Sequence, residues 1–240
     1  MSLHAESVQP VRLDPVGCIS EGWNLIKDQY GLFLGITLVG ALLAGAVPFG
    51  ILAGPMYCGI FLALFMKMRR EPVEFATLFK GFDYFLESLI VTLLFLVLLV
   101  AVMVPFMIAF FGLIAVVAGI GRGANLDAMA FAILVPAFGV AVPVLMILNL
   151  FLQAWLWFAY PLLVDRNLRA WPALTLSAKA VWANKWGVLG LMLLNWLLGA
   201  AGVLLCYIGL ILYLPIFFAS FAIAYRRMFG EPAPPPAPNM

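Results

Sequence analysis

The sequence predicts an all-α protein, a polytopic bundle of transmembrane helices with about six spans in three hairpins. Of its 240 residues, 66% are hydrophobic and only 10% are charged, whereas roughly a quarter of a soluble domain is charged. Residues 88–118 and 128–164 contain no Lys, Arg, Asp or Glu, and each run exceeds the ~20 residues that cross a bilayer. Neither run alternates with the period of a membrane β-barrel strand, so the spans are predicted to be helices.

The apolar runs give the predicted spans in order: residues 32–53, 55–68, 86–118, 128–164, 187–203 and 206–225. The third and fourth runs are longer than a bilayer requires. Pro105 lies in the third run, and Pro136 and Pro143 lie in the fourth. Because proline removes a backbone donor and kinks a helix, we expect these helices to be bent, tilted or extended beyond the membrane, with a re-entrant break as the alternative.

The ends of the chain differ from the spans in composition. Residues 1–15 form a polar N-terminal segment, and residues 16–230 form the predicted six-span domain. No apolar stretch follows a basic start, so no cleaved signal peptide is expected. The tail "EPAPPPAPNM", residues 231–240, is predicted to be extended and disordered, with a ligand for a proline-binding module as the alternative.

The distribution of basic residues predicts the topology. If the N-terminus is cytoplasmic and each run crosses once, twelve of the thirteen basic residues lie inside, as the positive-inside rule requires. The exception is Arg122, in "GIGRGANLD". The sequence therefore predicts a multi-pass protein of a cell inner membrane, with its N-terminus and C-terminus in the cytoplasm.

Two stretches, about residues 16–72 and 172–232, are predicted to be copies of one unit. Gly31 aligns with Gly187, and the basic pair of "MKMRREP" aligns with that of "YRRMFGEP". Both copies begin and end inside, so this internal repeat is parallel rather than inverted. The alternative explanation is that basic residues follow every inward-ending span in membrane proteins.

Aromatic-rich stretches precede the first, third and fifth spans, and they are predicted to be short amphipathic helices at the membrane interface. In "FATLFKGFDYFLESL", apolar residues recur at helical spacing from Phe75 to Leu86. In "WPALTLSAKAVWANKW", Leu174, Val181 and Lys185 share one stripe. Such helices either bind anionic lipid or simply anchor the hairpins. The candidate anionic-lipid contacts are Arg69, Arg70, Lys179, Lys185, Arg226 and Arg227.

Few polar side chains fall inside the predicted spans. Asn149 and Gln153 lie four residues apart in the fourth run, and Asn195 lies in the fifth. Amides in a membrane usually form hydrogen bonds between helices, and a substrate contact is the alternative.

The residue patterns of catalysis are missing. His4 is the only histidine, and the sequence contains no CxxC and no G-x-S-x-G motif. The protein is therefore predicted not to be an enzyme and to need no cofactor or metal. Basic residues strung along a membrane face also fit nucleic acid poorly.

Three stretches, "LIKDQYGLFLG", "GPMYCGIFLALFMKMRREP" and "FATLFKGFDYF", together resemble a group of bacterial six-span membrane proteins. The group is related to the membrane domain of some glycerophosphoryl diester phosphodiesterases and to allied domains of unknown function. The resemblance covers roughly residues 16–230 and implies a six-span fold. In those phosphodiesterases the chemistry belongs to a separate soluble barrel, so no catalytic residue is carried over.

The predicted function is that of an integral membrane protein without intrinsic catalysis. It would organise membrane lipids or partner proteins, either other membrane proteins or further copies of itself. The alternative is a transporter or channel for a small or lipid-like solute, which would need polar side chains aligned through the bilayer.

Overall fold

The structure is a computed structural model that describes residues 11–120, 126–204 and 208–230. Across these ranges the chain is helical and has no β-strand, which confirms the predicted all-α class. His4, Arg122, Cys206 and the proline-rich tail lie outside the described residues, as do the predictions made for them.

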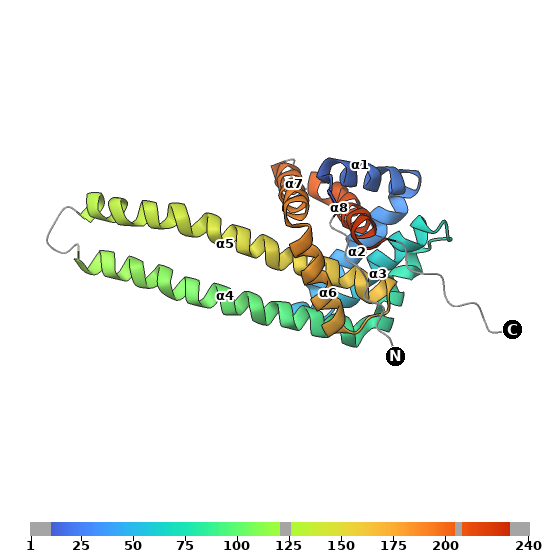
Figure 1. The fold of residues 1–240 in the computed structure, drawn as a ribbon, viewed down its shortest axis with the longest axis horizontal. Coiled ribbons are helices and arrows are strands. Elements are labelled where there is room, and N and C mark those ends of the chain that lie inside the picture. Colours follow the sequence, from blue (N-terminus) through green and yellow to red (C-terminus); the bar gives the residue numbers. More distant parts are fainter. Residues whose placement is uncertain (1–10, 121–125, 205–207, 231–240) are drawn as a thin grey trace. The chain divides into compact units, whose positions relative to one another are not determined.

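The described chain consists of α-helices and three short 3-10 helices (Figure 1). In chain order these are α1 (Pro15–Ile26), η1 (Lys27–Gln29), α2 (Tyr30–Ala46), η2 (Pro48–Gly50), α3 (Ala53–Met68), η3 (Phe75–Tyr84), α4 (Phe85–Ile120), α5 (Leu126–Asp165), α6 (Ala170–Ala183), α7 (Lys185–Leu204) and α8 (Ile208–Phe229).

Within the described residues, five helical stretches are long and apolar enough to cross a membrane. They are Pro15–Ala46, Phe75–Gly112, Gly139–Asp165, Lys185–Leu204 and Ile208–Phe229. Helix α3 is also apolar but has 16 residues, or about 24 Å, which is less than the ~30 Å of a hydrocarbon core. These helices are typical of a multi-pass membrane protein, while the count of six spans stays a prediction.

The predicted first span, residues 32–53, is wrong at its end. Helix α2 already stops at Ala46, and Val47 is extended, with φ −107° and ψ 128°. The cause is Pro48, since proline disfavours the helical conformation of the residue before it. The chain then turns through η2, where Gly50 has φ +66°, before α3 begins.

The two long runs form one continuous helix each. Helix α4 has 36 residues and contains Pro105, and α5 has 40 residues. The re-entrant break is therefore wrong for the described residues. At about 1.5 Å per residue these helices are about 54 Å and 60 Å long, well beyond the thickness of a hydrocarbon core.

The described chain divides into two compact units, one made of residues 1–93 and 154–240 and the other of residues 94–153. The second unit consists of antiparallel parts of α4 and α5. Its apolar side chains are largely exposed, as at Val97, Ile108 and Val140. Such exposed apolar surfaces are suited to contact lipid.

In the first unit, α3 packs closely against η3. A Cβ atom on Gly59 would lie 2.0 Å from the carbonyl oxygen of Leu78, and one on Gly81 would lie 2.0 Å from that of Pro55. Backbones this close tolerate only glycine, as in small-residue contacts between membrane helices. The 3-10 form of η3 buries Thr77, Leu78 and Gly81.

The predicted apolar face of this segment is wrong at Leu78. A 3-10 helix has three residues per turn instead of 3.6, and Leu78 and Gly81 share its buried face, whereas Phe75, Phe79 and Phe82 are exposed. That these exposed rings lie at a membrane interface stays a prediction.

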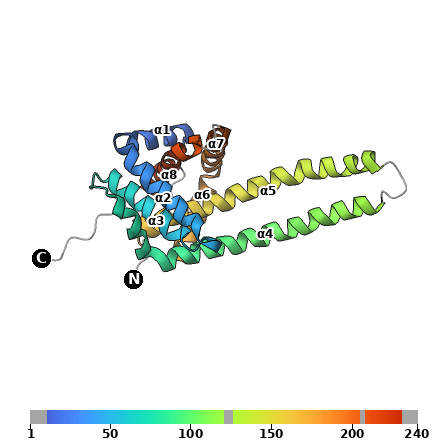
Figure 2. The same cartoon turned by 180° about the vertical axis from the view of Figure 1, so that it is seen from behind.

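Aromatic rings fill the space between α3, α5 and α8. Helices α2 and α3 pack together, as do α7 and α8, and α1 lies along α8 (Figure 2). Phe61 of α3 contacts Phe218 of α8, and Phe65 contacts Tyr225 with ring centroids 5.3 Å apart. Trp157 of α5 meets Phe218 at 5.3 Å. This core holds the ends of α3, α5 and α8 together.

Candidate functional site

The amides predicted in the fourth run contact each other. In α5, the Nε2 of Gln153 donates a hydrogen bond of 2.5 Å to the Oδ1 of Asn149, one turn earlier. Both side chains are half-buried. Side chains four apart on a helix are neighbours, and this bond engages one donor of Gln153 and the acceptor of Asn149 within α5.

Asn195 is buried between α7 and α8. Its Oδ1 accepts hydrogen bonds from the hydroxyls of Tyr213, at 2.8 Å, and Ser220, at 3.3 Å. Its Nδ2 donates to the carbonyl of Leu191 at 2.8 Å. The amide also lines a cavity of about 430 Å³ whose other walls are mainly apolar, including Leu210. Asn195 thus joins two helices and presents little free polarity to this cavity.

The six candidate lipid contacts fall into two groups. Arg69, Arg226 and Arg227 each pair with a carboxylate. In the described ranges, no hydrogen bond or ion pair engages the side chains of the other three: Arg70, Lys179 and Lys185. In the described ranges, the second group has no carboxylate partner, although the Lys185 ammonium lies near the rings of Trp182 and Trp186.

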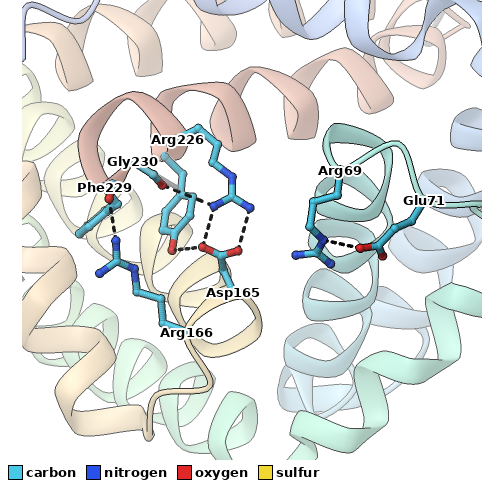
Figure 3. Close-up of polar contacts among 8 residues, drawn as sticks. Arg69, Glu71, Asp165, Arg166, Arg226, Phe229 and Gly230 are labelled. Carbon is cyan, nitrogen blue, oxygen red and sulfur yellow. Dashed lines mark hydrogen bonds and ion pairs between the residues drawn. The ribbon is translucent and has the colours of Figure 1, made fainter. Parts of the chain in front are cut away.

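Arg226 is the most deeply engaged of the first group (Figure 3). Its two terminal nitrogens donate to both carboxylate oxygens of Asp165, at 2.8 and 2.9 Å, and the Asp165 side chain is fully buried. The hydroxyl of Tyr225 donates to the same carboxylate at 2.9 Å. The Arg226 guanidinium also lies 4.6 Å from the ring centroid of Phe65. This bidentate pair links α5, α8 and α3 and is suited to a structural role.

Two other contacts complete this end of α8. Arg166 donates to the carbonyl of Phe229 at 2.6 Å, and Arg227 donates to Glu21 of α1 at 2.8 Å (Figure 3 shows the first). Arg69 pairs with Glu71 across the exposed end of α3. Asp165 was not predicted as a partner, although it is the first charge after the uncharged run 128–164.

Helix α6 has one buried and one exposed face. The buried face is Ala170, Ala173, Leu174, Ser177, Ala180 and Val181. It is held against α5, where Trp155 donates to the carbonyl of Leu174 at 2.6 Å and Ser177 donates to the carbonyl of Trp155 at 2.7 Å. The predicted stripe through Lys185 is wrong at that residue, because α6 ends at Ala183 and Lys185 begins α7.

The exposed face of α6 carries the aromatic and basic residues. Trp171, Thr175, Lys179 and Trp182 follow one another at helical spacing, and all four are exposed. Trp186, in the first turn of α7, is 79% exposed. The Lys185 ammonium lies 5.2 Å from the ring centroid of Trp182. We call Trp171, Lys179, Trp182, Lys185 and Trp186 the tryptophan–lysine surface.

Beside this surface lies a cavity of about 590 Å³. It is formed by residues 11–15 and by the junction of α6 and α7, and both Arg12 and Lys185 line it. Sequence reasoning missed Arg12 as a site residue, because nothing in its local pattern shows that it lines a cavity together with Lys185.

Metal ligands and reactive cysteines form no site in the described ranges. No group of three His, Cys, Asp or Glu residues there could hold a metal ion. Cys18 and Cys58 are buried and free.

Comparisons with protein-family models, curated proteins and solved structures find no match to this chain.

Proposed function

We propose that this chain is an integral membrane protein without catalysis of its own that organises anionic lipids at the cytoplasmic face of a bacterial inner membrane. The observation that supports this proposal most directly is the tryptophan–lysine surface. Tryptophan rings favour the membrane–water interface, and lysines near a bilayer surface attract anionic lipids by about 1 kcal/mol each. A water-exposed surface would gain nothing from three exposed tryptophans.

The proposal includes six spans in three hairpins, with both termini in the cytoplasm and a parallel repeat. The positive-inside pattern supports this topology. If α3 crosses the membrane, it is shorter than the hydrocarbon core. Local thinning of the bilayer can make up the difference, and Lys67 and Arg69 at the end of α3 can extend their charged groups toward the headgroups. The relationship to the phosphodiesterase membrane domain remains part of the proposal.

The test is native mass spectrometry of the protein released gently from its own membrane. We expect a stoichiometric anionic lipid on the wild type and a clear loss of it in a Lys179→Ala, Lys185→Ala double variant. A particle that carries no lipid, or lipids in the proportions of the bulk membrane, would overturn lipid organisation and direct attention to partner proteins.

A transporter of a lipid-like solute is the second candidate, favoured by the cavity of about 430 Å³ beside Asn195. A transport path needs free polar groups, whereas Asn149 contacts Gln153 and Asn195 contacts Tyr213 and Ser220. We expect a double Asn149→Leu, Gln153→Leu variant to keep its lipid and its stability. Loss of a measured solute flux in this variant would favour transport instead.

A further inference from the structure

We propose that the cavity between residues 11–15 and the α6–α7 junction binds the phosphate of an anionic phospholipid headgroup, and this inference rests on the lipid-organising function proposed above. The tryptophan–lysine surface alone would attract anionic lipids without a defined position, whereas this cavity would hold one lipid at one site. The two residues that would contact the phosphate are Arg12 and Lys185.

The walls of the cavity are fixed by close packing. A Cβ atom on Gly187 would lie 2.5 Å from the Cβ of Leu13, so Leu13 rests directly on the first turn of α7. The backbone N–H of Val11 donates to the Oδ1 of Asn184 at 2.8 Å. Arg12 lies between these two attachment points. Its backbone is therefore held beside the start of α7.

The charge of the cavity is uncompensated. Among the described residues that line it are Arg12 and Lys185, and none of these lining residues is a carboxylate. The nearest acid in sequence, Asp14, instead caps α1 by accepting the N–H of Val16 at 3.2 Å. Within the described ranges, neither basic side chain forms an ion pair or a hydrogen bond. By contrast, Lys67, Arg69, Arg226 and Arg227 all pair with carboxylates.

Two uncompensated cations in one cavity favour a phosphate with net negative charge. A guanidinium and an ammonium both form charge-assisted hydrogen bonds to phosphate oxygens. A zwitterionic choline headgroup would bring its own positive charge into the same space, and this repulsion lowers its affinity. The first amides of α7 also point toward its N-terminal end, which adds a weaker attraction for an anion.

The surroundings favour a lipid over a soluble anion. Trp186 lines the cavity and is 79% exposed, and Trp182 beside it is 69% exposed. Tryptophan at the headgroup level packs against glycerol and upper acyl carbons. A phosphate held between Arg12 and Lys185 would therefore have a surface for the attached chains, which a free phosphate does not use.

The test uses the full chain in detergent, titrated with phosphatidylglycerol or with phosphatidylcholine, and counts bound lipids by native mass spectrometry. We expect one tight phosphatidylglycerol on the wild type. Arg12→Gln and Lys185→Gln should each weaken it roughly tenfold or more, the loss expected for one charge-assisted hydrogen bond. Arg12→Lys should largely restore binding. Lys80→Gln is the matched control, since Lys80 is exposed, has no partner in the described chain and lies outside the cavity.

The outcomes separate the two proposals. If phosphatidylglycerol binds selectively but Arg12→Gln and Lys185→Gln leave its affinity unchanged, this site is overturned and lipid organisation stands. If wild-type protein shows no preference for the anionic lipid, both are overturned. Displacement of the lipid by millimolar glycerol phosphate would assign the cavity to a free phosphate compound. Unchanged thermal unfolding of each variant shows that lost binding is not lost folding.

Discussion

The two stretches predicted to be copies, residues 16–72 and 172–232, have the same order of α-helices in their described parts but use their basic pairs differently. Each begins with a short helix and continues into two longer ones, α1 to α3 and α6 to α8. In the first, Arg69 forms an exposed pair with Glu71. In the second, Arg226 forms a buried pair with Asp165. A basic residue after a span thus indicates a side of the membrane, but it does not indicate a role.

What the two endings share is the way the last helix stops. Arg70 has φ 60° and Gly230 has φ 69°, and in the sequence each directly precedes Glu-Pro. Both residues occupy the left-handed position that commonly terminates a helix. The helix ends therefore correspond at Arg70 and Gly230, whereas the sequence alignment matched Arg70 with Arg227, which lies inside α8.

The largest expected difference in stability is between Asp165 and Glu71, the acidic partners of the two basic pairs. Asp165→Asn leaves Arg226, whose side chain is only 14% exposed, without its counter-ion, and we expect a loss of about 3–5 kcal/mol in the free energy of unfolding. Glu71→Gln should cost about 0–1 kcal/mol, because the Arg69 pair is exposed and screened by solvent. Denaturant unfolding in detergent measures both changes. Equal losses would remove the distinction between the two basic pairs.

The next largest effect on stability is expected at the aligned glycines, Gly31 and Gly187. A Cβ at Gly187 would overlap Leu13, whereas nothing lies within 4 Å of a Cβ at Gly31. We expect Gly187→Ala to cost about 1–3 kcal/mol by overpacking, and Gly31→Ala to change stability by less than about 1 kcal/mol in either direction. The same unfolding measurement compares them. A larger loss at Gly31 would contradict the packing described here.

The sequence predicted the elements best where charges bound an apolar run. Helices α4 and α5 begin and end within two residues of the predicted runs 86–118 and 128–164, because Glu87 and Asp165 mark their polar ends. The end of α2 was missed because Val47-Pro48 lies inside an apolar run, and hydropathy alone continues through it. Pro48, rather than the hydropathy of the run, indicates where α2 ends.

The candidate site was less predictable, because its contacts join distant parts of the chain. Composition drew attention to Lys179 and Lys185, which lie among tryptophans. Arg226 and Asp165 are 61 residues apart, so no local pattern links them. Arg12 lines the same cavity as Lys185 because Leu13 rests on Gly187, and this contact depends on tertiary packing. Whether any of these residues binds lipid remains a prediction.

The smallest expected effect tests the shared helix ending. At Arg70 the Glu71 N–H donates to the carbonyl of Met66 at 2.9 Å, and the Arg70 N–H donates to that of Lys67 at 3.1 Å, the pattern of a Schellman motif. A residue with a side chain is strained by about 1–2 kcal/mol in the left-handed region, and glycine relieves this strain. Glycine also loses more conformational entropy on folding, which offsets part of the gain. We therefore expect Arg70→Gly to stabilise the protein by about 0.5–1 kcal/mol.

The control is the neighbouring residue. Arg69 has φ −81° and ψ 3°, which any residue adopts, so glycine there relieves no strain and removes the contact with Glu71. Arg69→Gly should therefore be slightly destabilising, by up to about 1 kcal/mol. If both substitutions shift the unfolding midpoint in the same direction, loss of positive charge rather than backbone conformation dominates. In that case the left-handed residue would not be the feature that the two endings have in common.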